Sequence, residues 1–188
     1  DGRVAEELPS KDRDEVFEYF VFEELLKDYD FSRDEIESSW IDGDGDGGLD
    51  GFYVVINGHL LDGSGDCPWP RSSAAIDVWL ITCKHHDTFR QATLDAVLAT
   101  LPEIFDFSLS EDDLNGRYSE ELLGARALFA DAYKRLSIGN PVLRFHVAYG
   151  SRGDSASVGE SILARSRQIQ QKLADLFSSC SVDFRFVG

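Results

Sequence analysis

The most hydrophobic segment of the chain, residues 76–83, contains one charged side chain and ends directly before Lys84. The segment is far shorter than the roughly 18 apolar residues that would span a membrane. A short apolar run of this kind, preceded by a loop rich in Gly, Pro and Ser, predicts a buried β-strand. The chain is therefore expected to fold around a buried strand, not around a membrane helix.

Helix and strand patterns alternate around this central segment. Apolar residues at helical spacing predict helices over residues 11–29, 88–105, 119–137 and 160–177, with a short helical turn over 32–38. Short apolar runs predict strands over residues 52–56, 59–61, 142–149 and 182–187, and Asn57-Gly58 is typical of a tight hairpin. This order predicts a single α/β domain with a central mixed β-sheet flanked by helices.

The composition indicates a folded domain and restricts its partners. Of 188 residues, 43% are hydrophobic and 12% are aromatic, too many for a disordered acidic tail. The 35 acidic and 18 basic residues leave a net charge of −17, whereas a nucleic-acid coat protein is basic. Any polyanion would therefore have to be bound locally, through a metal ion or a small basic patch.

The cysteines and the start of the chain bear on its location. Three cysteines without CxxC spacing argue against a disulfide framework or a zinc ribbon. The chain does not open with a basic and then apolar segment, as a signal peptide would. These features predict a cytoplasmic protein without a membrane segment. The absence of Met, even at position 1, predicts a fragment of a longer protein.

Two charged residues stand at the ends of predicted strands. Asp50 closes the acidic, glycine-rich stretch 42–51, and Lys84 follows the hydrophobic strand. If strands 52–56 and 76–83 are neighbours, both side chains can lie at the same end of the sheet. A carboxylate can hold Mg²⁺ or Mn²⁺, which lowers the pKa of a bound water, and an ammonium can offset developing charge. The pair therefore suits metal-assisted phosphodiester hydrolysis, with a second acid and a strand carbonyl as further ligands.

The same residues carry a family resemblance. Residues 46–53, with the sequence DGGLDGFY, followed by LITCK at 80–84, resemble the paired motif of Mrr-like PD-(D/E)xK nucleases. In that family, G-x-D on one strand is followed by E-x-K or Q-x-K on the next. More widely, the chain resembles the N-terminal domain of abortive-infection phage-resistance (AIPR) proteins. The wider resemblance rests on residues 17–26, 34–37, 46–50, 57–58 and 80–84.

The resemblance implies a restriction-endonuclease-like, three-layer α/β fold and Mg²⁺- or Mn²⁺-dependent cleavage of nucleic acid in phage defence. By this resemblance Asp50 is the metal-binding aspartate and Lys84 the catalytic lysine. For the second acid and the strand carbonyl of the metal site, we expect Asp46 and the main-chain carbonyl of Cys83. DNA or RNA is the expected partner, bound through the full-length protein, and a protein partner or a second copy is also expected.

The family also places an acidic residue on the first helix. Glu18 is its best match here, and Glu23 and Glu24 are rivals, because the sequence does not fix which face of the helix meets the site. The first helix is rich in acidic residues, and Glu18 lies among them. A helix face exposed to solvent is therefore an equally good interpretation of Glu18.

The sequence departs from the family at Thr82, two residues before the lysine. A threonine hydroxyl brings no charge to a Mg²⁺ shell. Asp77 cannot replace it, because its odd offset from Lys84 places it on the opposite face of the strand. A nuclease-like domain that has lost catalysis, and acts as a sensor or interaction module, therefore remains the alternative.

Plainer interpretations exist for the same residues. Asp42, Asp44 and Asp46 match the first positions of a calcium loop, but the twelfth position is Tyr53 and a strand follows. In the plainest interpretation, the stretch is a turn with solvated aspartates and Lys84 is a surface lysine at the end of a strand. His85 and His86 are expected to be exposed, and Cys83 to be a buried apolar residue.

Overall fold

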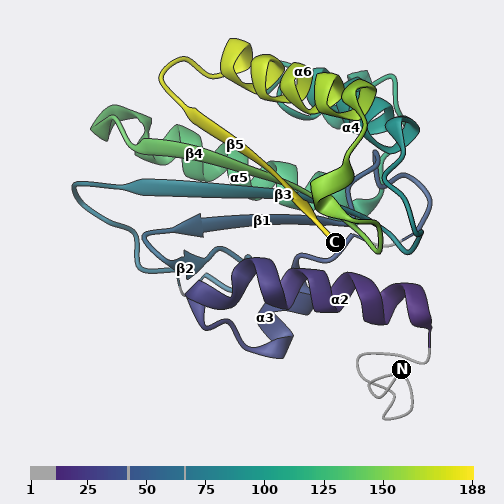
Figure 1. The fold of residues 1–188 in the computed structure, drawn as a ribbon. Coiled ribbons are helices and arrows are strands. Elements are labelled where there is room, and N and C mark those ends of the chain that lie inside the picture. Colours follow the sequence, from purple (N-terminus) through teal and green to yellow (C-terminus); the bar gives the residue numbers. More distant parts are fainter. Residues whose placement is uncertain (1–11, 42, 66) are drawn as a thin grey trace.

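A computed structural model describes residues 12–41, 43–65 and 67–188. Five strands form one sheet in the order β2-β1-β3-β4-β5 (Figure 1). The strands are β1 (Gly51–Ile56), β2 (His59–Leu60), β3 (Ala75–Lys84), β4 (Val142–Ser151) and β5 (Ser181–Val187). The helices are α2 (Arg13–Leu26), α3 (Arg33–Ser38), α4 (Gln91–Ile104), α5 (Glu120–Leu136) and α6 (Glu160–Leu176).

The sheet is mixed. β1 is antiparallel to β2 and to β3, while β3, β4 and β5 are parallel to one another. Asn57 and Gly58 join β1 to β2, and both have positive φ angles, 50° and 87°, as a tight hairpin turn requires. The predicted α/β class, the hairpin and the parallel arrangement of the later strands are confirmed.

Helices cover the sheet on both sides (Figure 1). Side chains alternate along β3, so that Ile76, Val78 and Leu80 belong to one core and Trp79, Ile81 and Cys83 to another. The first core also contains buried residues of α4, α5 and α6, and the second contains buried residues of α2 and α3. The central strand is buried because both faces are covered, which explains its hydrophobic sequence.

Element boundaries differ from the predicted ones in a few places. The first helix starts at Arg13, capped by the side chain of Asp12, and ends in a 3₁₀ turn at Lys27–Tyr29. Residue 11 lies outside the described residues. The helix expected from residue 88 begins at Gln91. The short helix α3 begins with the capping box formed by Ser32 and Glu35. No helix among the described residues is long and apolar enough to cross a membrane.

Candidate active site

Asp50 and Lys84 meet at one end of the sheet. The main-chain N–H of Asp50 donates to the carbonyl of Ile81 at 2.8 Å, which extends the β1–β3 pairing by one residue. Asp50 therefore stands beside the last residues of β3. The Lys84 Nζ atom lies 3.4 Å from Asp50 Oδ1. The structure thus brings together the two residues that the sequence singles out.

The Asp50 carboxylate is buried and held by β3. Its Oδ2 atom accepts the main-chain N–H of Cys83 at 2.5 Å and the Thr82 hydroxyl at 3.3 Å. The side chain is only 7% exposed. Burial raises the pKa of Asp50 above its ordinary 3.8, although the charge of Lys84 and the Cys83 N–H act against the rise. The ionised carboxylate is therefore not fully compensated by its protein partners.

Negative charge gathers around Lys84. Burial acts to lower the pKa of this lysine, but Asp50, Asp46 and Glu18 together raise it above its ordinary 10.5. Asp46 also raises the pKa of Asp50. Three acidic groups therefore act on the ammonium of Lys84, and two of them, Asp46 and Glu18, are additional to its ion-pair partner Asp50.

The loop that carries Asp46 is folded tightly against α4. Asp46 Oδ1 accepts the main-chain N–H of Gly48 at 2.7 Å, and the Thr100 hydroxyl donates to the carbonyl of Gly47 at 2.8 Å. Gly48 has a φ angle of 82°, and a Cβ there would lie 2.9 Å from the Cβ of Ala96. Glycine is required here both for the backbone angle and for the close approach.

Strand β1 follows this loop at Gly51, where a calcium loop of the EF-hand kind has a helix. Asp44 is exposed, and Asp42 lies outside the described residues. Among the residues that the structure describes, no group of three or more His, Cys, Asp or Glu side chains is arranged to hold a metal ion. A metal here would therefore depend on one or two carboxylates with main-chain and water oxygens.

Glu18 approaches the site from α2, on the other face of the sheet. The Trp40 indole Nε1–H donates to Glu18 Oε2 at 2.9 Å. Trp40 also forms a β-bridge with Gly51, the residue after Asp50. Of the two rival acids, Glu24 pairs with Lys27 at 2.6 Å, and Glu23 lines a surface cavity beside Tyr19. Glu18 is thus the helix acid whose charge reaches Lys84.

Cys83 contributes to the site through its main chain, while its side chain is part of the hydrophobic core. Burial raises the pKa of the thiol well above 9.0, and Gly150 lies against the sulfur on the α2 side. The main-chain N–H of Cys83 points toward Asp50. In a strand, the carbonyl of a residue points to the same edge as its N–H, so the Cys83 carbonyl is directed to this side too.

The expectation that His85 and His86 are exposed is wrong, because His86 is partly buried and so is His85. Its Nδ1 atom lies 2.7 Å from Asp14 Oδ1, and its ring stacks on Phe17 at 5.2 Å. The carbonyl of His86 accepts hydrogen bonds from the N–H of Arg152 and the hydroxyl of Ser151. Both partners of His85 lie on the first turns of α2, and the sequence does not fix which face of that helix meets the sheet.

The sequence also gave no indication of a charged cluster on the α2 side of β3, β4 and β5. Asp77 lies on that face, opposite to Thr82 and Lys84, as its offset predicts. It pairs with Arg144 at 2.5 Å and with His146 at 3.0 Å. His146 stacks on Trp79 at 4.5 Å and contacts Asp183 at 2.5 Å.

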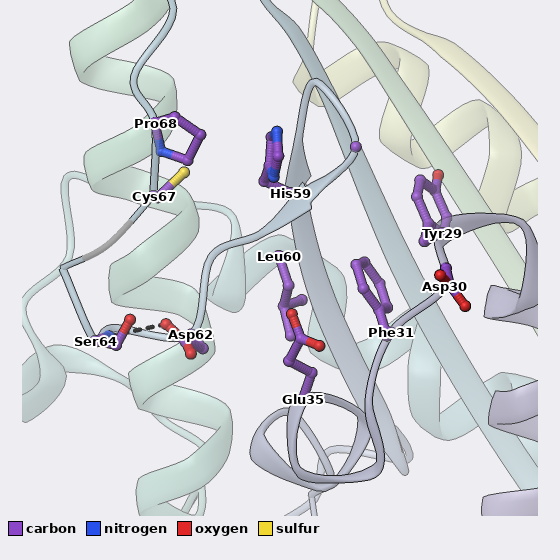
Figure 2. A pocket seen from close by; sticks show the side chains of 11 residues that line it. Tyr29, Asp30, Phe31, Glu35, His59, Leu60, Asp62, Ser64, Cys67 and Pro68 are labelled. Carbon is purple, nitrogen blue, oxygen red and sulfur yellow. Dashed lines mark hydrogen bonds between the residues drawn. The ribbon is translucent and has the colours of Figure 1, made fainter.

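A cavity of about 330 Å³ lies away from these residues (Figure 2). It opens beside the hairpin, where Gly58 and His59 line it together with Tyr29 and Phe31 of the α2–α3 connection. Asp50 precedes β1 and the hairpin follows it, so the cavity lies at the opposite end of that strand. None of the candidate site residues lines it.

Comparisons with family models, with curated proteins and with solved structures gave no match to this chain.

Proposed function

We propose that this chain is a restriction-endonuclease-like domain that hydrolyses phosphodiester bonds of nucleic acid with Mg²⁺ or Mn²⁺. The observation that carries the proposal is the buried Asp50 carboxylate, which lies 3.4 Å from Lys84 at the end of β3. Burial raises the pKa of Asp50, and the opposing effects of Lys84 and of the Cys83 N–H do not cancel the rise. The charges of Asp46 and Glu18 also act on Lys84 and raise its pKa. A divalent cation would relieve this excess of negative charge, whereas a purely structural ion pair would not need the additional acids.

The donor set fits a hard divalent cation. Mg²⁺ binds oxygen ligands, keeps several waters and commonly uses only one or two carboxylates. Asp50, Asp46 and the carbonyl of Cys83 would hold it, and Thr82 would support Asp50 through its hydroxyl. When bound, the cation supplies polarisation of the phosphate and a water of lowered pKa.

The remaining roles belong to side chains already in place. Lys84 is half-buried, and the raised pKa of its ammonium keeps it protonated at neutral pH. It would orient the attacking water and offset the negative charge that develops on the phosphate oxygens. Glu18, held by Trp40, would orient the waters around the cation from the α2 side.

The acidity of the chain limits nucleic-acid binding by this domain alone. Affinity for DNA or RNA arises largely from neutralisation of phosphates by Lys and Arg, and the chain has a net charge of −17. We propose that the basic surface is supplied by other parts of a full-length, cytoplasmic phage-defence protein. This last step rests on the sequence resemblance to AIPR proteins.

Metal binding is the first test. We expect Mn²⁺ titrated into the chain in a calorimeter to bind, and binding to be lost in Asp50→Asn. The matched control is Asp44→Asn, an exposed aspartate of the same loop, which should bind as wild type does. Equal binding by wild type and Asp50→Asn, or no binding by either, would refute the proposed site. Binding in wild type alone would justify cleavage assays on single- and double-stranded substrates.

Thr82 favours a second candidate function, a nuclease-like sensor or interaction module without catalysis. In the nuclease motif that the sequence resembles, this position holds Glu or Gln, whereas here the Thr82 hydroxyl donates to Asp50. Metal binding without cleavage of any nucleic acid by the full-length protein would select this candidate.

A further inference from the structure

The two edges of the sheet differ in a way that concerns association. The edge strand β2 contains only two residues, His59–Leu60. The opposite edge strand, β5, contains seven, Ser181–Val187, and pairs only with β4 within the part of the chain that the structure describes (Figure 1). A long unpaired edge is a template for pairing with another strand.

β5 lacks several of the features that prevent such pairing, although α6 reaches one position of the strand, where the Gln170 side chain donates to the main-chain carbonyl of Val182 at 3.3 Å. Natural edge strands are blocked by proline, by charged side chains and lysine above all, by a bulge, by a covering helix or loop, or by being very short. β5 has the sequence SVDFRFV, without Pro or Lys, and its register with β4 is regular over its whole length. On one face Val182, Phe184 and Phe186 are only partly buried against the main core. On the other face Asp183 and Arg185 are 43% and 55% exposed.

The order of these side chains makes the strand complementary to itself. When two copies of β5 lie antiparallel about a twofold axis at Phe184, each Asp183 faces the Arg185 of the other copy. The same register places Phe184 opposite Phe184, and Val182 opposite Phe186. Opposite charges and aromatic pairs directly across two strands stabilise a sheet, and like charges destabilise it. A twofold axis requires this kind of reciprocal pairing.

We propose that two copies of this chain associate through β5, in this antiparallel register, and form one continuous sheet. The occupant is a second copy because β5 itself supplies both partners of the charge pair and of the aromatic pair. Within each monomer Arg185 already lies 3.1 Å from Asp183. In the dimer each charge gains a second partner across the axis. β4 separates β5 from the strands that carry Asp50 and Lys84, so the pairing leaves that site open.

Charge reversal tests the register. We expect sedimentation of the wild-type chain to show a concentration-dependent dimer. Arg185→Asp brings acidic residues opposite each other, and Asp183→Arg brings basic ones, so each variant alone should dimerise about tenfold more weakly or worse. An equimolar mixture of the two variants restores both opposite-charge pairs and should form a heterodimer.

The matched control is Arg117→Asp, which makes the same charge change at an exposed arginine before α5. It should dimerise as wild type does. Circular dichroism of each variant separates loss of pairing from loss of folding, because Asp183 also contacts His146. A wild-type chain that stays monomeric at all concentrations overturns the proposal, as does a mixture that associates no better than its components.

Discussion

The indole N–H of Trp40 donates to the Oε2 atom of Glu18 at 2.9 Å, and this bond joins α2 to the segment that leads into β1. Trp40 is held in turn by the rings of Phe22 and Tyr19, at 5.7 and 6.4 Å. A rigid aromatic donor thus fixes an acidic side chain whose charge reaches Lys84. The arrangement resembles the outer-shell support that orients metal ligands.

Replacement of Trp40 by Phe is expected to keep the packing and remove the donor. Because Glu18 would lose its orientation, Mn²⁺ affinity should fall about tenfold, measured by calorimetry. Trp69→Phe is the control, since Trp69 stacks under Arg135, with 4.1 Å from the guanidinium carbon to the ring centroid. An unchanged affinity in Trp40→Phe would show that Glu18 does not act at the metal.

Replacement of Asp50 by Asn should stabilise the metal-free chain while removing metal binding. The folded-state pKa of Asp50 is raised above its ordinary 3.8. A carboxyl with a raised pKa costs stability above that pKa and costs nothing below about 3.8, where it is protonated in both states. At pH 7 the variant should therefore be more stable by roughly 0.5–2 kcal/mol in urea unfolding. The gain should disappear near pH 3, and a less stable variant at pH 7 would contradict this account of the site.

The sequence predicted the parts of this fold that depend on short-range patterns. The period of apolar residues located β3 and the helices, and Asn57-Gly58 located the hairpin. It also placed Asp50 and Lys84 at one end of neighbouring strands. The contacts of Glu18 with Trp40 and of His85 with Asp14 could not be predicted, because they depend on how α2 lies across the sheet. The charge cluster around His146 depends on the register of three strands, which the sequence does not fix.

Replacement of Gly48 by Ala is expected to displace the loop that carries Asp46. The φ angle of 82° strains any L side chain, and the new Cβ would lie 2.9 Å from Ala96. The cost in unfolding free energy should be about 2–3 kcal/mol. Gly43→Ala is the control, since Gly43 has a similar φ angle of 84° but no described atom within 4 Å of the new Cβ. Only the strain of about 1 kcal/mol should remain there, and equal costs in the two variants would exclude the steric explanation.

We expect His146 to limit the stability of the folded chain at alkaline pH, and Asp77 to limit it at acid pH. Burial acts to lower the pKa of His146, but contacts with Asp183 and Asp77 outweigh this effect and raise the pKa from 6.5 to about 9. The stabilisation from a raised pKa is complete below 6.5 and is lost as the pH rises through 9. The pKa of Asp77, despite its burial, is lowered from 3.8 to about 2 by Arg144 and His146. Its stabilisation is present above 3.8 and is lost as the pH falls through 2.

Urea unfolding at pH 6, 8 and 10 checks the alkaline limit. We expect the wild-type chain to lose about 2 kcal/mol between pH 6 and pH 10. His146→Gln keeps a hydrogen-bonding side chain without a titrating ring, and its stability should vary less over the same interval. Parallel pH profiles for the two proteins would show that His146 does not titrate in this range.

Replacement of Thr82 by Glu tests whether the departure from the nuclease motif that the sequence resembles weakens the proposed metal site. Thr82 is 1% exposed and donates to Asp50. A carboxylate there would face the Asp50 carboxylate, so the metal-free variant should lose about 2–3 kcal/mol of unfolding free energy at pH 7. Added Mn²⁺ would neutralise both groups, so it should bind at least about tenfold more tightly and restore the lost stability. Thr100→Glu, which places the same charge at a buried threonine of α4, should be destabilised without gaining affinity for Mn²⁺. If Thr82→Glu binds Mn²⁺ no better than wild type does, residue 82 is not directed at a metal, and the family motif does not describe this end of the sheet.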